Sequence, residues 1–161
     1  TAAGITQRPQ RHTATLLAAL LLAFRSELHA QPATTNTPAV QFRAVDVFVD
    51  SKDQPLAAYQ LEFTATNGVA RIVGIEGGEH PAFAQPPFSD PKAMQHERVI
   101  LAAFSMNAAD KLPKGKTRVA TIHVQTSGAA ELAFETKLQT AADVRGKSLE
   151  AKAISEERKP K

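Results

Sequence analysis

The chain has 161 residues, of which 43% are hydrophobic, so it is long enough for one domain with a real core and too apolar to be wholly disordered. It contains no cysteine, which excludes disulfides, thiolate metal ligands and cysteine nucleophiles. The formal net charge is +3, of which residues 1–30 contribute +2, from Arg8, Arg11 and Arg25 against Glu27. The remaining residues are therefore nearly neutral, and nucleic acid is not the expected partner.

Residues 1–30 have the pattern of a secretory signal peptide. Two arginines precede an unbroken apolar run at 16–24, which is shorter than the roughly 20 residues needed to cross a bilayer. Ala30 offers a small residue for cleavage, and the Pro- and Thr-rich segment 31–41 is typical of a flexible linker. We therefore predict a secreted protein, periplasmic or extracellular, with no stable membrane span after processing. The alternative is that the apolar run forms a buried helix of the domain.

From Val40 onward the hydrophobic pattern repeats every two residues, as in half-buried β-strands. The first strand is predicted at 44–50 and the second at 56–66, where Tyr59, Leu61 and Phe63 share an apolar face. The opposite face of the second strand consists of Ala58, Gln60, Glu62 and Thr64.

The middle of the chain combines a hairpin, a long loop and one apolar strand. Asn67-Gly68 predicts a tight turn into a strand at 69–78. Segment 79–97 is predicted to be a loop, because its four prolines lack the backbone donor that a central strand needs. The nearly continuous apolar run 98–104 is typical of a strand covered on both faces, and 105–113 has room for one short helical turn.

Three further strands are predicted in the C-terminal part, at 117–126, 131–138 and 148–154, before a charged tail at 156–161 that we expect to fray. The domain at 42–155 therefore holds about seven short strands, separated by turn residues, and no convincing helix. Such a pattern predicts an all-β fold, an antiparallel β-sandwich.

Four segments carry a resemblance to a known family. They are LAAYQLEFTAT (56–66), ARIVGIEGGE (70–79), ERVILAAF (97–104) and GKTRVATIHVQT (115–126). In this order and spacing they resemble the bacterial cohesin domains, which are jelly-roll sandwiches related in fold to some carbohydrate-binding modules. Residues 127–155 match only by strand order, and the Pro/Thr-rich start departs from the family pattern.

The resemblance implies a partner and a surface. Cohesins bind dockerin modules through a sheet face that includes the outward residues of the strand matching 56–66. A dockerin-like protein partner is therefore implied at Ala58, Gln60, Glu62 and Thr64. The alternative is that these residues are simply the solvated face of an antiparallel sheet.

No constellation of residues predicts catalysis, a metal site or a cofactor. The acidic and histidine residues of 76–97 lack metal-ligand spacing, and Asp46, Asp50 and Asp53 lack the glycine and closing glutamate of a calcium loop. We expect Asp50 and Asp53 to cap a turn and His123 to face solvent. The chain also has no nucleophile elbow and no phosphate-binding loop. We therefore expect that the protein is not an enzyme and that it needs no cofactor.

The sequence favours a secreted, non-catalytic recognition module that binds a protein partner through a sheet face. The resemblance to cohesins implies that this module could belong to an assembly that handles polysaccharide. A second interpretation is a carbohydrate-binding module. The chain has no tryptophan, so only Phe83 and Phe88 in the long loop could offer rings to a sugar. A third interpretation is a structural domain of the cell envelope without a dedicated partner.

Overall fold

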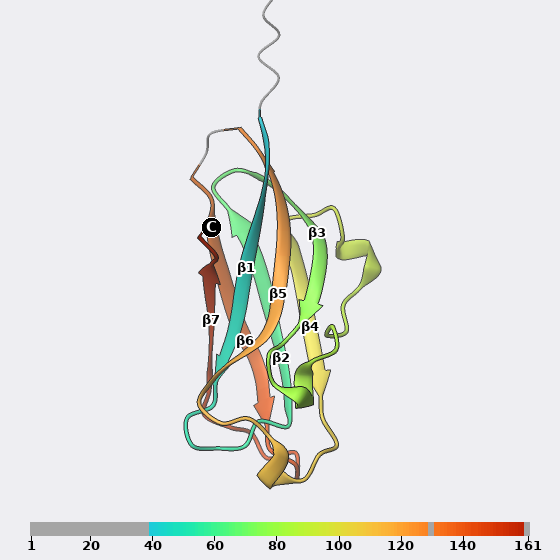
Figure 1. Cartoon of the computed structure of the whole chain (residues 1–161), viewed down its shortest axis with the longest axis vertical. Coiled ribbons are helices and arrows are strands. Elements are labelled where there is room, and N and C mark those ends of the chain that lie inside the picture. Colours follow the sequence, from blue (N-terminus) through green and yellow to red (C-terminus); the bar gives the residue numbers. More distant parts are fainter. Residues whose placement is uncertain (1–38, 129–130, 160–161) are drawn as a thin grey trace, which may run out of the picture. The chain divides into compact units, whose positions relative to one another are not determined.

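A computed structural model describes residues 39–128 and 131–159 of the chain (Figure 1). It contains a β-strand at each of the seven places where the sequence predicts one. The strands are β1 Val40–Asp50, β2 Ala58–Thr66, β3 Val69–Gly77, β4 Arg98–Phe104, β5 Lys116–Ser127, β6 Ala133–Ala142 and β7 Lys152–Glu157.

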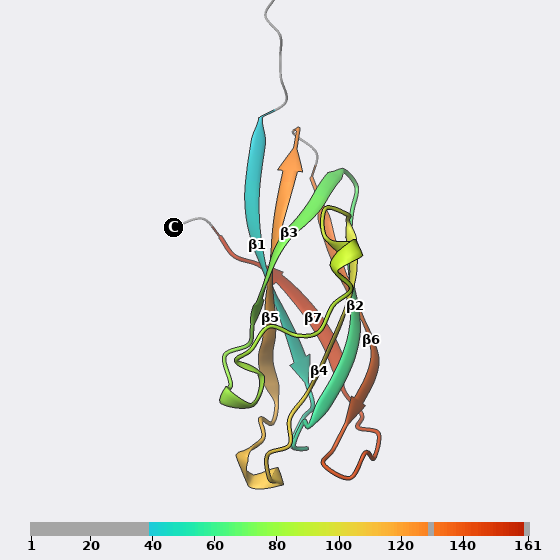
Figure 2. The ribbon, with the colours of Figure 1, turned by 90° about the vertical axis from the view of Figure 1, so that its right-hand side faces the viewer.

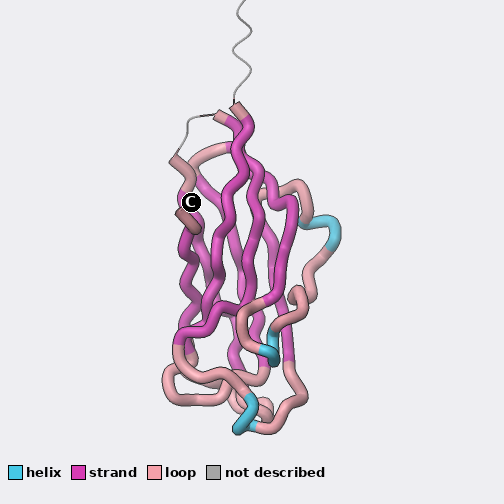
Figure 3. Tube along the Cα trace, in the orientation of Figure 1, coloured by secondary structure: helices cyan, strands magenta, loops and turns pink. Residues whose placement is uncertain are grey.

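Helical structure in the described part of the chain is confined to short 3₁₀ turns, which lie in loops between strands (Figure 3). Pro81–Phe83 and Pro91–Ala93 interrupt the long loop, and Ala109–Lys111 forms the single turn predicted within 105–113. The all-β prediction is therefore confirmed.

The strands form two antiparallel sheets that pack face to face as a β-sandwich (Figure 2). One sheet has the order β3-β5-β1-β7 and the other the order β4-β2-β6. The predicted tight turn at Asn67-Gly68 joins β2 to β3, but the predicted hairpin is wrong, because these two strands do not pair with each other. Asn67 takes a φ of +65°, which asparagine tolerates better than most residues. Because β2 and β3 belong to different sheets, this turn connects the two layers.

The core comes from the inward residues of both sheets. On β2, Leu61 and Phe63 are fully buried, and Leu61 lies between Leu101 of β4 and Leu138 of β6. Tyr59 is also buried, and its hydroxyl donates a hydrogen bond across the sandwich to the carbonyl of Val119 at 3.2 Å. Burial raises the pKa of Tyr59 far above its ordinary value. The apolar side chains supply most of the folding energy, since burying one of this size contributes about 1.5–3 kcal/mol.

The long loop after β3 covers one edge of each sheet. On β3, the amide of Ile72 donates to the carbonyl of His96 at 2.8 Å, and the amide of Gln95 donates to the carbonyl of Ile72 at 2.9 Å. On β4, Phe88 and Ala102 exchange two backbone hydrogen bonds of 2.8 and 3.0 Å. The loop thereby pairs backbone groups that would otherwise be free on two edge strands.

Several predicted boundaries are wrong, most clearly those at the two ends of the domain. The last two residues of the predicted linker 31–41 belong to β1, and β7 continues through Glu157, into the tail that was expected to fray. The tail is held by contacts that are distant in sequence: Glu156 pairs with Lys116, and Glu157 pairs with Arg43 at 3.5 Å. A run of charged residues that looks solvated can therefore complete a sheet when it meets opposite charges.

The predicted signal peptide, 1–30, and most of the predicted linker lie outside the described residues. Within the residues that are described, no helix is long and apolar enough to cross a membrane.

Candidate functional site

The outward residues of β2 lie where the sequence predicts them. Together with their neighbours they form the solvent-facing side of the β4-β2-β6 sheet, which we call the outer face. The strand register arranges this face in four rows: Phe104–Ala58–Ala142, Ala102–Gln60–Thr140, Ile100–Glu62–Lys137 and Arg98–Thr64–Glu135. Two rows are therefore mostly apolar or small, and the other two are mostly charged.

The apolar part of the outer face carries two exposed aromatic rings. Phe88 is 69% exposed and Phe104 is 61% exposed, and their rings stack with centroids 6.2 Å apart and planes only 11° from parallel. Ile100 is 37% exposed on the same face of β4. We call Phe88, Ile100 and Phe104 the aromatic patch. The side chains beside it on the sheet, Ala58 and Ala102, are too small to cover the rings.

Ile100 and Phe104 are not among the binding residues that the sequence predicts, because the apolar run 98–104 is typical of a strand covered on both faces. In the structure β4 is an edge strand: Val99 and Leu101 are buried, whereas Ile100 and Phe104 face solvent. A continuous apolar run has the same pattern whether its second face meets more protein or carries an exposed patch. No local signal in the sequence separates the two cases.

The charged part of the outer face is held together by its own side chains. Arg98 makes a bidentate contact with Glu62, with N–O distances of 2.9 and 2.7 Å. The hydrogen bond from Arg98 holds the pKa of Glu62 below its ordinary value. A β-bulge leaves Gln139 without a register partner, and its side-chain oxygen accepts a hydrogen bond from Gln60. The bulge thus brings a further polar side chain to this part of the face.

The two aromatic residues of the long loop have different environments. Phe83 is only 3% exposed and packs edge-on against Tyr59, with ring centroids 5.4 Å apart. The turn is fixed by the side chain of His80, which accepts from the amide of Ala82 at 3.2 Å. The suggestion that Phe83 could meet a sugar is therefore wrong, because its ring belongs to the core. Phe88 alone of this pair is available to a ligand.

Several of the residues weighed for catalysis or metal binding have structural partners. Asp50 accepts from the amide of Lys52 at 3.0 Å, which confirms the predicted turn cap. His123 lies on the outward side of β5, with its Nε2 atom 2.9 Å from a carboxylate oxygen of Glu76. In the part of the chain that the structure describes, no three acidic or histidine side chains gather as metal ligands would.

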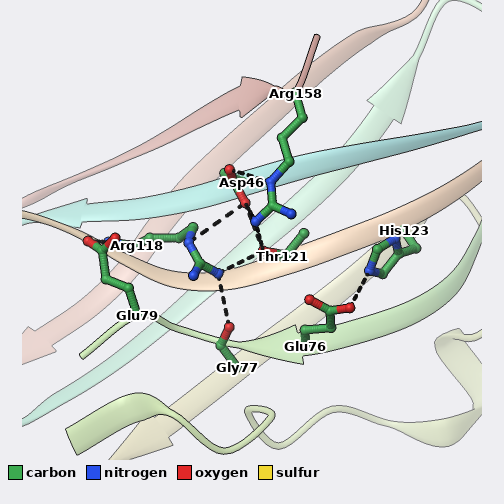
Figure 4. Close-up of polar contacts among 8 residues, drawn as sticks. All are labelled: Asp46, Glu76, Gly77, Glu79, Arg118, Thr121, His123 and Arg158. Atoms are coloured by element: carbon green, nitrogen blue, oxygen red, sulfur yellow. Dashed lines mark hydrogen bonds and ion pairs between the residues drawn. The ribbon is translucent and has the colours of Figure 1, made fainter. Parts of the chain in front are cut away.

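A polar network crosses the outward side of the four-stranded sheet (Figure 4). At its centre, Asp46 of β1 accepts from Arg158 Nε at 2.8 Å and from the hydroxyl of Thr121 on β5 at 2.7 Å. Arg118 donates to Thr121 at 2.8 Å and to the carbonyl of Gly77 on β3 at 3.2 Å. The network therefore links β3, β5 and β1 to the chain just after β7.

Thr121 uses its complete hydrogen-bonding capacity in this network. Its hydroxyl donates to Asp46 and accepts from both Arg118 and Arg158, the latter at 3.1 Å. A hydroxyl has one donor and two acceptor positions, so none is left for a ligand. We interpret the network as a structural clamp on the end of β7.

Acid should weaken this clamp. Burial alone would raise the pKa of Asp46, but hydrogen bonds from Arg158 and Thr121, and the charges of Arg158 and Arg118, lower it below its ordinary value. A lowered carboxylate pKa stabilises the folded state above the unfolded pKa, and this stabilisation is lost as the pH falls through the folded pKa. At neutral pH, Asp46→Asn should therefore cost about 1–3 kcal/mol.

Urea unfolding of wild type and Asp46→Asn, at about pH 6 and about pH 2, measures this effect. The difference between the two proteins should shrink at the lower pH, because the stabilisation from a lowered carboxylate pKa is lost as the pH falls below the unfolded pKa. An equal difference at both values would contradict a charged Asp46 at the centre of the clamp.

Comparisons of the chain with protein-family models, with curated proteins and with solved structures find no match. Any function must therefore be inferred from the geometry of the two outward surfaces.

Proposed function

We propose that this chain is a secreted, non-catalytic recognition domain that binds a protein partner through the outer face of the β4-β2-β6 sheet. The observation that carries the proposal is the exposed, stacked pair of Phe88 and Phe104. Burying a phenylalanine side chain stabilises a fold by about 1.5–3 kcal/mol. Because both rings are mostly exposed, most of this stabilisation is absent in the isolated domain. Contiguous apolar side chains on a protein surface commonly mark an interaction site.

The composition of the outer face supports a protein partner. Interfaces usually have an apolar centre with aromatic anchors and a polar rim. Here the aromatic patch adjoins Gln60, Glu62 and Arg98, whose fixed geometry can discriminate between partners through charge. The resemblance of 56–66 to the partner-facing strand of cohesins supports the same face. A jelly-roll, cohesin-like fold and a dockerin-like partner are part of this proposal, as is export by the N-terminal segment.

The paired substitution Phe88→Ser with Phe104→Ser tests the proposed face. Proteins encoded beside the gene for this chain supply the candidate partners, with dockerin-bearing ones first, and calorimetric titration measures their binding. Because anchor residues contribute about 2–4 kcal/mol each, we expect binding to weaken by about a hundredfold or more. The melting temperature should change little, because both rings are mostly exposed.

Val69→Ser is the matched control for this pair, because Val69 is an exposed apolar residue on the other sheet. It should leave binding unchanged. Partner binding that survives the loss of both rings would overturn the proposal and locate recognition elsewhere.

Carbohydrate binding is the second candidate, and the near-parallel geometry of the two exposed rings favours it. Sugars can pack their C–H faces against aromatic rings, although the rings here are phenylalanine and not tryptophan. Affinity electrophoresis in gels that contain soluble polysaccharide distinguishes the two functions. Retardation of wild type, lost in the paired variant, would support a carbohydrate-binding module.

A further inference from the structure

The edge of β1 offers a second interaction surface, on the sheet opposite the proposed binding face. β5 pairs with β1 along its whole length, beginning at Val40 opposite Ser127. β7 pairs with β1 only from Val45, and the last contact on this side is a hydrogen bond of 2.8 Å from the amide of Arg158 to the carbonyl of Ala44. β7 therefore ends beside the middle of β1 (Figure 1), and no described residue is paired with 40–43 on that side.

The backbone of this segment is oriented for a further strand. In an antiparallel ladder, the N–H and C=O groups of one residue point to the same side, and the side alternates along the strand. Because the carbonyl of Ala44 points toward β7, the backbone groups of Phe42 and Val40 point to the same, open side. An extended peptide laid beside β1, in line with β7, could exchange hydrogen bonds with these groups.

The long loop covers the edges of β3 and β4, whereas it does not cover this part of β1. β3 is paired with Gln95 and His96, and β4 with Phe88. Proteins usually shield a free edge with a loop, a proline or charged side chains. The open part of β1 has charged side chains beside it but no covering loop or proline among the described residues, and it presents Phe42, which is 72% exposed, and Val40, which is 52% exposed.

The side chains around the edge define the chemistry of the occupant. A groove of about 450 Å³ runs beside it and is lined by Arg43, Glu157, Arg158 and Lys159, together with residues of 41–44. Arg158 pairs with Asp46 and Arg43 with Glu157, so the excess positive charge comes from Lys159. The excess positive charge favours acidic side chains. It disfavours a second copy of the chain, since a two-fold pairing of this edge would bring two positive grooves together.

We propose that the 40–44 edge of β1 binds an extended, acidic peptide segment of a partner, which adds a strand antiparallel to β1 beyond the end of β7. Backbone hydrogen bonds to Phe42 supply much of the affinity, and Lys159 selects for carboxylates. The clamp on Asp46 holds the end of β7 at Ala44 and so determines where the open edge begins. This site is independent of the outer face of the β4-β2-β6 sheet.

The test uses the full 161-residue chain, labelled with ¹⁵N, and two capped heptapeptides. One probe alternates glutamate with valine, and the other alternates lysine with valine. We expect the glutamate peptide to shift the amide resonances of 40–44 and of Arg158 and Lys159, and to slow hydrogen exchange at Phe42. The lysine peptide should have little effect on either.

Two variants address the backbone and the charge separately. Phe42→Pro removes the outward N–H, which bonds to no residue of β5, and should weaken binding of the glutamate peptide by about tenfold or more, equivalent to about 1.4 kcal/mol. Lys159→Glu should weaken it to a similar degree, while its matched control, Lys152→Glu on β7, should not. Lys159→Glu also keeps the proposal testable if Phe42→Pro fails to fold.

Several outcomes would overturn the proposal. These are an absence of shifts at 40–44, an equal response to the lysine peptide, or binding that is insensitive to both Phe42→Pro and Lys159→Glu.

Sedimentation of the free protein provides a further check. A dimer that disappears in Phe42→Pro would assign this edge to a second copy of the chain. The Phe88 and Phe104 substitutions should leave peptide binding unchanged, so this proposal and the proposed function can fail separately.

Discussion

Replacing Leu61 by alanine should lower the free energy of unfolding by about 2–5 kcal/mol. Leu61 is fully buried at the centre of β2, with Leu101 and Leu138 opposite it on the two neighbouring strands. The loss has two parts, the transfer energy of the deleted methyl groups and the cavity that they leave. The cavity persists because the hydrogen-bonded strands on both sides cannot close in. Urea unfolding of the two proteins measures the difference.

The matched control is the adjacent residue on the other side of the same strand. Gln60 is exposed, and Gln60→Ala should change stability by less than about 0.5 kcal/mol. A larger cost for Gln60→Ala than for Leu61→Ala would mean that the two faces of β2 are exchanged. A register shift of a single residue produces that exchange.

Local patterns were enough to predict the strands and the two faces of β2. The alternation in 56–66 has only one arrangement that buries Tyr59, Leu61 and Phe63 together, and the structure buries all three. The turn at Asn67-Gly68 could also be predicted, because the preference of Asn-Gly for a tight turn depends on these two residues alone. These features depend on side-chain period and turn preference, which need no knowledge of distant parts of the chain.

Features that depend on distant contacts were not predicted. Asp46 and Arg158 are 112 positions apart, and nothing near either residue indicates that the chain after β7 returns to β1. Phe83 and Phe88 are close in sequence and similar in local composition, yet one is buried and the other exposed. The difference arises from how the loop is tied to the two sheet edges.

The candidate binding face was predicted in part. The outward residues of β2 were identified correctly, but the stacked ring pair was not, since it needs Phe88 to bridge to Ala102 beside Phe104. Such a bridge joins a loop to an edge strand and leaves no periodic signal in the sequence. The sequence therefore names one ring of the pair, Phe88, and misses Phe104, with which it forms the exposed stack that carries the proposed function.

Gly77→Ala is the second substitution for which we expect a large effect. A Cβ atom at Gly77, the last residue of β3, would lie 2.1 Å from the carbonyl oxygen and 2.5 Å from the carbonyl carbon of Ala84. Both atoms belong to the backbone of the long loop, so no side chain can rotate away to relieve the overlap. We expect a loss of about 1–3 kcal/mol, the usual cost of overpacking, measured by urea unfolding.

The loop cannot easily move away, because it is attached immediately before the clash. The amide of Gly78 donates to the carbonyl of Phe83 at 2.7 Å, and the ring of Phe83 is packed against Tyr59 in the core. A movement of Ala84 should therefore disturb Phe83, and the fluorescence of Tyr59, the only tyrosine in the chain, reports on its surroundings.

Gly74→Ala separates this close approach from the general effect of replacing glycine in a strand. Gly74 lies in the same strand, but a Cβ atom there would be no closer than 3.5 Å to any other group, at the side chain of His123. The substitution should be neutral, or stabilising by up to about 1 kcal/mol, since alanine restricts the unfolded chain more than glycine does. Equal costs for the two variants would show that the loop does not press on Gly77. Phe83 and Phe88 would then lack the support that holds one ring in the core and the other on the binding face.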